Sequence, residues 1–210
     1  MLANSGTTAN IGNYTRLGAD GQPLAIQAAT WADTGSNAAG TRWECIKDNQ
    51  SGLIWEVKTK HETSALRHYT ASFTWFDDNF ATNGGNAGTE TDGAAAVCNG
   101  VADPSKCNTK AYTTAVNALP AGQALCGFRN WRMPDRFELR SIALATASNP
   151  AIRATHFPDV NLNLSSGATW SASPYSGYSD GALGVNFNEG YGYLGDKYFG
   201  WSARLVRSGQ

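Results

Sequence analysis

The sequence predicts an α+β domain in which two helices pack on short, mostly antiparallel strands gathered from both ends of the chain. Three observations predict it: alternating apolar runs occur within residues 43–57 and again after residue 168, two helix-start signals lie between them, and four cysteines can form cross-links. Because glycine-rich and polar segments join these runs, we expect a loop-rich domain with two disulfides.

The first 40 residues are rich in Ala, Gly, Thr, Asn and Ser and show little periodicity. Two short ordered runs, 14–17 and 24–26, flank an Asp20-Gly21 turn with the chemistry of a hairpin. We therefore expect residues 1–40 to form an N-terminal extension or an edge hairpin, and residues 41–210 to form the main domain.

A second hairpin is predicted at the start of the main domain. Runs 43–46 and 53–57 place apolar residues at alternating positions on either side of a turn at 48–52. Further along, residues 81–108 form a long polar segment rich in Gly, Asn, Thr and Ala. Loops of this length are uncommon inside compact domains and are often functional.

Two helices are predicted after this loop. Asn108 is a suitable N-cap for a helix over 109–118, whose apolar residues fall on one face at helical spacing. A second helix is expected to start at Asp135, which forms a capping-box pattern with Glu138, and to fade near residues 148–150.

The chain after residue 168 predicts short strands separated by Gly and Ser. The expected strands are 169–173, 183–187 and 203–207, and the glycine- and tyrosine-rich segments between them are expected to form turns.

The even number of cysteines is typical of a disulfide framework, and four cysteines allow three pairings. We favour Cys98–Cys107, which closes a short polar loop, and Cys45–Cys126, which ties an N-terminal strand to the segment after a helix. Each bridge is expected to stabilise the fold by about 2–4 kcal/mol. A zinc site is not expected, because no Cys-x2-Cys spacing occurs and the three histidines are scattered.

Charge and hydropathy exclude several classes of protein. The net charge is −1 and charged residues make up only 16% of the chain, so we expect no nucleic-acid partner. No apolar run approaches the length of a membrane span, so we expect no membrane insertion. The first residues lack the basic start and apolar stretch of an export signal, and we expect that such a signal was removed.

Several segments form an ordered set: 43–49, 51–59, 107–109 with 111–112, 125–127 with 130–134, 170–171 and 204–210. This set resembles the Lcl C-terminal domain family, which is named for the end domain of a bacterial collagen-like adhesin and is often filed as a domain of unknown function. The resemblance covers roughly residues 40–210.

The resemblance implies a C-type lectin-like fold, similar to that of the formylglycine-generating-enzyme superfamily, and an extracytoplasmic, secreted or cell-surface location. For the adhesin that names the family it also implies binding to sulfated glycosaminoglycans and assembly into a homotrimer. The family has no agreed catalytic residues. The related enzymes rely on a cysteine late in the chain, and no cysteine follows Cys126 here.

The segment 170–201 is the predicted ligand-binding face. Tyr, Ser, Gly and Asn dominate it, as they dominate antibody paratopes, because a tyrosine gives a large rigid contact with a polar tip. The alternative is that half of these aromatic residues belong to the core of a twisted sheet. The candidate residues are Trp170, Tyr175, Tyr178, Asn186, Asn188, Tyr191, Tyr193, Asp196 and Tyr198.

A basic cluster in the second helix provides a candidate sulfate site. Five arginines accompany only two acidic residues between positions 129 and 153, and Arg136 and Arg140 are spaced to share a helix face. The alternative is an ordinary solvated face.

Acidic and amide side chains of the kind that hold Ca²⁺ are also present. They include Asp77, Asp78, Asp180 and Glu189, but no calcium-loop motif occurs. We therefore expect no cofactor, with Ca²⁺ as the alternative.

These observations predict a non-catalytic surface domain of adhesin type that recognises glycans. No nucleophile-elbow or zinc-protease motif occurs, so enzymatic activity is not expected. Three alternatives remain open: a display domain for protein partners that is hypervariable in its C-terminal region, a trimer-forming structural cap, and an enzyme of unknown type. The expected partner is a glycan or a host or cell-surface protein.

Overall fold

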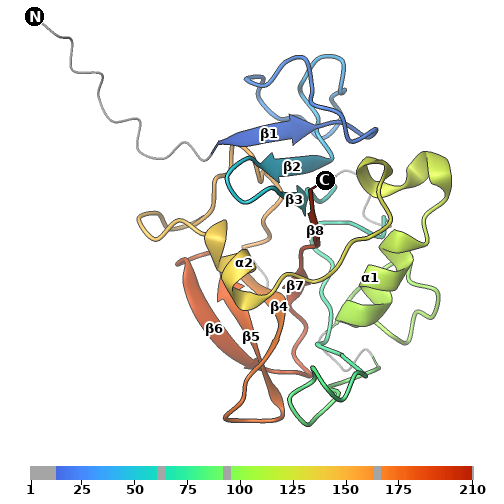
Figure 1. Cartoon of the computed structure of the whole chain (residues 1–210), viewed down its shortest axis with the longest axis vertical. Coiled ribbons are helices and arrows are strands. Elements are labelled where there is room, and N and C mark those ends of the chain that lie inside the picture. The colour runs from blue at the N-terminus through green and yellow to red at the C-terminus, as the bar shows by residue number, and fades with distance from the viewer. Residues whose placement is uncertain (1–12, 61–64, 92–95, 163–166, 210) are drawn as a thin grey trace, which may run out of the picture.

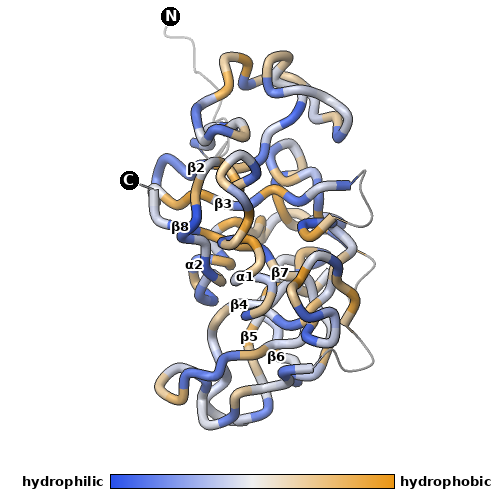
Figure 2. The backbone as a smooth tube through the Cα atoms, turned by 90° about the vertical axis from the view of Figure 1, so that its right-hand side faces the viewer, coloured by the Kyte–Doolittle hydropathy of each residue, from blue (hydrophilic) through white to orange (hydrophobic). Residues whose placement is uncertain are grey.

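The computed structural model of the chain describes residues 13–60, 65–91, 96–162 and 167–209. Two four-stranded sheets lie at opposite ends of the molecule, with the helices between them (Figure 1). The same order is visible after a quarter turn, where the sheet that contains β2 and β3 lies above the one that contains β4, β5 and β6 (Figure 2). The expected mixture of helices and short strands is confirmed.

The first sheet joins the two ends of the chain. Its antiparallel order is β1 (Tyr14–Leu17), β2 (Cys45–Asp48), β3 (Leu53–Glu56) and β8 (Val206–Ser208). The predicted second hairpin is thereby confirmed, and β3 carries an apolar stretch that is orange in Figure 2.

The predicted N-terminal hairpin is only partly formed. Residues 24–26 make no strand; the chain after the turn pairs only through a bridge between Leu17 and Pro23. The Gln27 side chain explains this difference, because it binds both backbone groups of Arg16. Its Oε1 accepts from the Arg16 N–H at 2.7 Å, and its Nε2 donates to the Arg16 carbonyl at 3.0 Å.

The second sheet has the order β6 (Tyr191–Asp196), β5 (Gly181–Asn186), β4 (Ala168–Pro174) and β7 (Ser202–Ala203), with β4 and β7 parallel. Two predictions were wrong here. Residues 191–196 form an edge strand and not a turn, and the predicted strand 203–207 splits between β7 and β8, so that it connects the two sheets.

Both predicted helices are present. Helix α1 (Thr109–Asn117) is capped by Asn108, whose Oδ1 accepts from the Ala111 N–H at 2.8 Å. Helix α2 (Arg136–Ser141) begins with the predicted capping box and is shorter than expected. Two short 3₁₀ turns, Ala121–Gln123 and Leu125–Gly127, follow α1.

Six tryptophans fill the interior and hold the sheets and helices together. Each is at most 2% exposed, and two of them, Trp170 and Trp201, stack with ring centroids 3.9 Å apart. Large aromatic side chains of this kind dominate core energetics. The six are Trp43, Trp55, Trp75, Trp131, Trp170 and Trp201.

Both favoured disulfides are formed. Cys45–Cys126 ties β2 to the second 3₁₀ turn, and Cys98–Cys107 closes a short loop before α1. Disulfides form and persist in oxidising compartments, so the pair indicates an extracytoplasmic environment. No helix in the described part of the chain is long and apolar enough to cross a membrane.

A buried ionic cluster joins β3, α1 and the C-terminal segment, and nothing in the sequence patterns predicted it. Glu56 Oε1 accepts from the Tyr112 hydroxyl and lies 3.5 Å from Lys58 Nζ. Arg204 Nη2 pairs with Asp159 Oδ2 at 3.0 Å, and Arg204 Nη1 donates to the Glu56 carbonyl. Burial lowers the pKa of Lys58 to about 8, because its effect is larger than the opposite effect of the Glu56 charge.

Lowering the pH from 7 to 5 is expected to destabilise the fold through His156, with a fall of a few degrees in Tm. Burial, followed by the positive charges of Arg16 and Arg153, lowers the pKa of His156 from 6.5 to about 4. Between these values the unfolded chain binds a proton that the folded chain does not, so stability decreases as pH falls through this window.

Thermal melts of wild type and His156→Gln at both pH values test this expectation. The variant should lose much of the decrease, because glutamine does not titrate. The carboxylates with a lowered pKa affect stability mainly below pH 5, because their ordinary pKa values are 4.5 for Glu and 3.8 for Asp. They are Glu44, Asp78, Asp103 and Glu138. Equal decreases in both proteins would assign the effect to other groups.

Candidate functional site

Helix α2 is fixed in place by charge-assisted hydrogen bonds at its start. Asp135 Oδ1 accepts from the backbone N–H groups of Phe137 and Glu138, and Glu138 returns a bond to the Asp135 N–H at 2.9 Å. Arg132 grips the Glu138 carboxylate with two bonds of 2.6 Å. The two arginines within α2, Arg136 and Arg140, line a groove against the second sheet.

A groove with a cavity volume of 610 Å³ lies between α2 and the β5–β6 hairpin. It brings together Tyr191 and Tyr193 of the predicted face with the predicted sulfate-binding arginines. Its lining residues are Arg136, Phe137, Arg140, Leu183, Gly184, Val185, Tyr191, Gly192, Tyr193 and Leu194.

Strand alternation decides which side chains form the floor of the groove. Val185 packs in the same cluster as the core residues of α2, so its cross-strand partner Gly192 faces α2 as well. A Cβ added at Gly192 would meet nothing within 4 Å. The glycine therefore leaves open space where a larger side chain would fill the groove.

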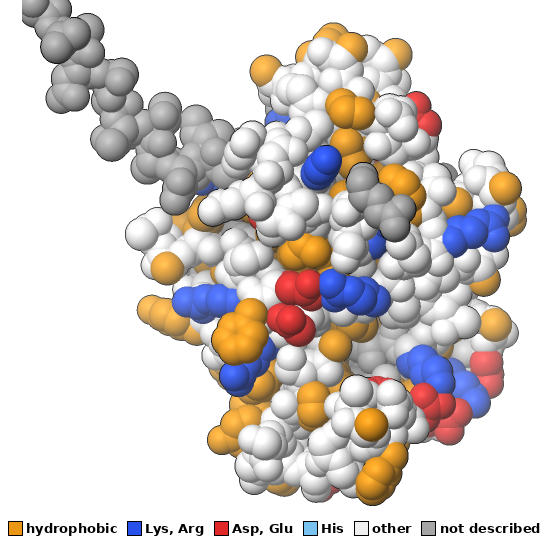
Figure 3. Space-filling view, in the orientation of Figure 1, with side chains coloured by type: hydrophobic (Ala, Val, Ile, Leu, Met, Phe, Trp, Pro, Cys, Tyr) orange, Lys and Arg blue, Asp and Glu red, His pale blue; other side chains and the backbone are white. Residues whose placement is uncertain are grey.

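The rim of the groove carries exposed aromatic rings and guanidinium groups. Phe137 is 69% exposed and Tyr191 61% exposed. Figure 3 shows basic side chains on either side of a hydrophobic one over α2. Arg136 lies 4.5 Å from the Phe137 ring centroid, and Arg140 Nη1 donates to the Gly190 carbonyl. Neither arginine has a carboxylate partner among the described residues.

The tyrosines of β6 lie at the edge of this groove, on the opposite side of the strand from Gly192. The Tyr193 ring centroid is 5.6 Å from that of Trp201, and Gly195 is so close to Trp201 that an added Cβ would approach within 2.2 Å. Tyr193 thus has one side against the core and is still 45% exposed.

Trp170 and Asn186 were predicted as ligand-binding residues, and the structure corrects both. Trp170 is fully buried, and its indole N–H donates to the Phe73 carbonyl at 2.8 Å. Asn186 is 3% exposed and accepts from the Asn188 N–H at 2.7 Å. Sequence patterns could not separate these core positions from the exposed aromatic positions around them. Asn188 is half-buried in the β5–β6 turn.

Comparison with known proteins places this arrangement in a family. The model of the Lcl C-terminal domain matches residues 44–207. The chain belongs to the Lcl C-terminal domain family. This family points to a surface domain of adhesin type. No curated protein and no solved structure matches the chain.

The other predicted residues of this Lcl C-terminal domain do not line the groove; they lie in the β4–β5 connection, at the end of β6 and in the turn after it. Tyr175, Tyr178 and Tyr198 are all exposed. A hydrogen bond to Asp196 raises the pKa of Tyr178, so Asp196 already has a partner.

Lys197 anchors these turns, and sequence reasoning missed it. It is 2% exposed, and its Nζ donates to the carbonyl oxygens of Asn83, Asn86 and Ser179 at 2.9, 2.6 and 2.7 Å. The ammonium also lies 4.4 Å from the Trp75 ring centroid.

The acidic residues considered for Ca²⁺ are dispersed and take part in local contacts. Asp77 accepts from Thr82, Asp78 pairs with Lys110, and Asp180 accepts from Asn86. Within residues 13–60, 65–91, 96–162 and 167–209, no group of three or more His, Cys, Asp or Glu side chains could hold a metal ion.

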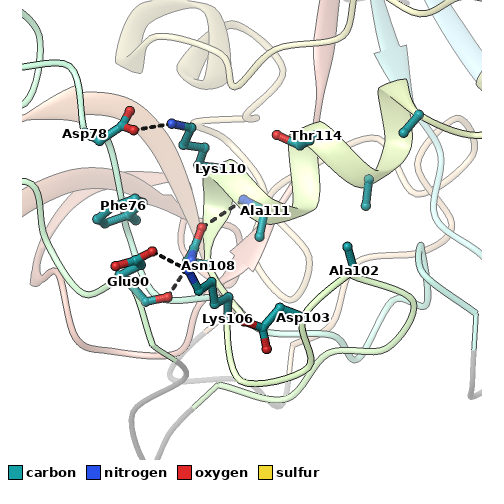
Figure 4. Close-up of a pocket in the computed structure, with 12 residues that line it drawn as sticks. Phe76, Asp78, Glu90, Ala102, Asp103, Lys106, Asn108, Lys110, Ala111 and Thr114 are labelled. Atoms are coloured by element: carbon teal, nitrogen blue, oxygen red, sulfur yellow. Dashed lines mark hydrogen bonds and ion pairs between the residues drawn. The ribbon is translucent and has the colours of Figure 1, made fainter.

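A second cavity of 480 Å³ lies against α1 (Figure 4). Lys110 and Asp78 form an ion pair on one side of Phe76, and Lys106 pairs with Glu90 at 2.6 Å on the other. Because its charged groups already have partners, this cavity offers fewer free groups to a ligand than the groove between α2 and β6.

Proposed function

We propose that this Lcl C-terminal domain is a non-catalytic, extracytoplasmic binding domain of adhesin type that recognises glycans through the groove between α2 and β6. The observation that supports it is the combination of exposed aromatic rings with guanidinium groups that lack carboxylate partners around open space. Rigid rings supply large contact surfaces, and guanidinium groups bind carboxylates or sulfates by two parallel hydrogen bonds. The proposed fold is of the C-type lectin-like kind.

Binding to an acidic or sulfated glycan array tests this proposal. Tyr191→Ala with Tyr193→Ala, and separately Arg136→Gln, should each weaken binding about tenfold or more, because each removes a stacking surface or a charge-assisted bond. Arg136→Gln should also reduce the dependence of binding on salt, since screening acts on exposed charges.

Phe80→Ala is the matched control, because Phe80 is an exposed aromatic residue (83%) that does not line the groove. It should leave binding unchanged. Melting curves of the double tyrosine variant are needed, since Tyr193 also contacts Trp201. No array signal above background, with or without Ca²⁺, would refute glycan recognition.

One observation favours a protein ligand as the second candidate. β6 is an edge strand, and Tyr191, Gly192, Tyr193 and Leu194 are four consecutive exposed residues on it. Proteins usually protect such edges with charges or proline, because an open edge can pair with another chain. If residues 170–201 vary among sister genes far more than the rest of the domain, a display function is favoured over a glycan-binding one.

A further inference from the structure

Arg16 is a buried guanidinium that has no carboxylate partner among the described residues. It is 5% exposed, and it donates to the carbonyl oxygens of Ala29 at 2.6 Å and Thr155 at 2.9 Å. Its Nε has no hydrogen-bond partner in the part of the chain that the structure describes. Its guanidinium carbon lies 3.9 Å from the Trp43 ring centroid. Backbone carbonyls satisfy part of the group but do not neutralise its charge, and buried charges are normally paired.

A cavity of 340 Å³ adjoins this charge. Residues 28–31 form one wall, and the segment that contains Ala154, Thr155 and Pro158 forms the other. Arg16 connects the two walls, because it donates to a carbonyl oxygen in each. None of its lining residues is acidic. The volume falls within the range of small-molecule sites.

Trp31 gives this cavity a second buried donor that lacks an acceptor. Its indole Nε1 is shut off from solvent, and none of the described residues accepts a hydrogen bond from it. Because leaving a buried donor unpaired is energetically costly, unsatisfied groups of this kind require an explanation. A ligand that carries an acceptor, and that shifts the Trp31 side chain slightly, would satisfy it.

The electrostatic surroundings also favour an anion. The positive charges of Arg16 and Arg153 both act to lower the pKa of His156, which directly follows Thr155 in the chain. Burial and then the carboxylate of Asp48 raise the pKa of the nearby Tyr14, but Asp48 does not line the cavity. The region therefore has an excess of positive charge although the whole chain has a net charge of −1.

We infer that this cavity binds a small organic carboxylate, with the carboxylate toward Arg16 and the apolar body against Trp31 and Pro158. The anion supplies the missing counter-charge, which is worth most in a poorly solvated site. The site shares no lining residue with the groove between α2 and β6, so it is independent of the proposed glycan-binding function.

Titration with benzoate, with benzamide as the neutral analogue of the same shape, tests the inference by NMR. Benzoate at millimolar concentrations should shift the Trp31 indole N–H signal and raise the pKa of His156, whereas benzamide should bind about 10- to 100-fold more weakly because it lacks the charge. Equal effects of the two compounds, or no shift with benzoate, would overturn the inference.

Variants separate this site from the groove. Arg16→Gln should weaken benzoate binding about tenfold or more, and Trp31→Phe, which keeps a ring and removes only the N–H donor, should weaken it less. Arg136→Gln should leave it unchanged. If Arg16→Gln does not fold, the benzoate affinity of Trp31→Phe and the comparison with benzamide test the carboxylate site instead. Unchanged benzoate affinity in Trp31→Phe, together with equal binding of benzamide, would contradict a carboxylate site.

Discussion

Replacing Glu56 with glutamine is expected to lower the free energy of unfolding by about 3–5 kcal/mol, since removing one partner of a buried ion pair leaves the other charge uncompensated. Glu56 is fully buried, and its second oxygen accepts from the Leu205 N–H at 2.9 Å. A glutamine has only one side-chain oxygen, so it would accept from either the Tyr112 hydroxyl or the Leu205 N–H. Its NH₂ group would then face the other donor. Urea denaturation of wild type and variant measures the loss.

Glu90→Gln is the matched control for this substitution. Glu90 also pairs with a lysine, Lys106, but both side chains are about half exposed, and such pairs contribute about 0–1 kcal/mol. The loss in Glu56→Gln should therefore be several times larger. Similar losses in the two variants would show that burial of the cluster is not what makes Glu56 important.

The penalty of Glu56→Gln should also depend on pH. Glu56 raises the pKa of Lys58 against the larger effect of burial, so its removal moves that pKa further below 8. At pH 9 Lys58 is then largely neutral in the folded variant and no longer requires a counter-charge. We expect the difference in stability from wild type to be smaller at pH 9 than at pH 6.

The parts of the fold that the sequence predicted correctly depend on local signals. The β2–β3 hairpin follows from apolar alternation around a turn, and the helix starts follow from the Asn108 cap and the Asp135–Glu138 capping box. Each signal lies within a few residues of the element it specifies. Both disulfides could be inferred as well, because only four cysteines were available.

Strand β6 was missed because its glycines resemble turn residues. Gly195 is required by packing: the Trp201 ring occupies the place where a Cβ would be. In a strand interior a glycine often marks a close approach of this kind, but the approaching group cannot be identified from the sequence. Trp170 was assigned to the ligand-binding face for a related reason, because the sequence does not show which groups cover its side chain.

The candidate site was predicted in parts but not as a unit. The tyrosines of β6 and the arginines of α2 were treated as separate clusters, because about 50 residues lie between Arg140 and Gly190, which the structure brings into hydrogen-bond contact. The cluster around Glu56 shows the same limitation, since Glu56 bonds to Leu205 across 149 positions. Long-range contacts of this kind leave no periodic trace in the sequence.

Replacing both Cys45 and Cys126 with alanine is expected to lower the free energy of unfolding by about 4–5 kcal/mol in the loop-entropy description. The bridge closes a separation of 81 residues, so its removal releases a large unfolded loop. Both side chains are at most 1% exposed and lie in the core cluster that includes Tyr112, so a packing loss adds to this effect. Urea denaturation under non-reducing conditions provides the measurement.

The other disulfide is the matched control for this double substitution. Cys98–Cys107 closes a separation of only 9 residues, and the same description gives about 2.5–3 kcal/mol for replacing both of its cysteines with alanine. Its loop lines the cavity on α1, and neither cysteine lies in a strand of the first sheet, so its loss should loosen that loop and leave the β2–β3 hairpin intact. Hydrogen exchange should then show local opening before α1 in this variant and faster exchange throughout the first sheet in the Cys45–Cys126 variant. Equal losses of stability from the two replacements would contradict the dependence on loop length.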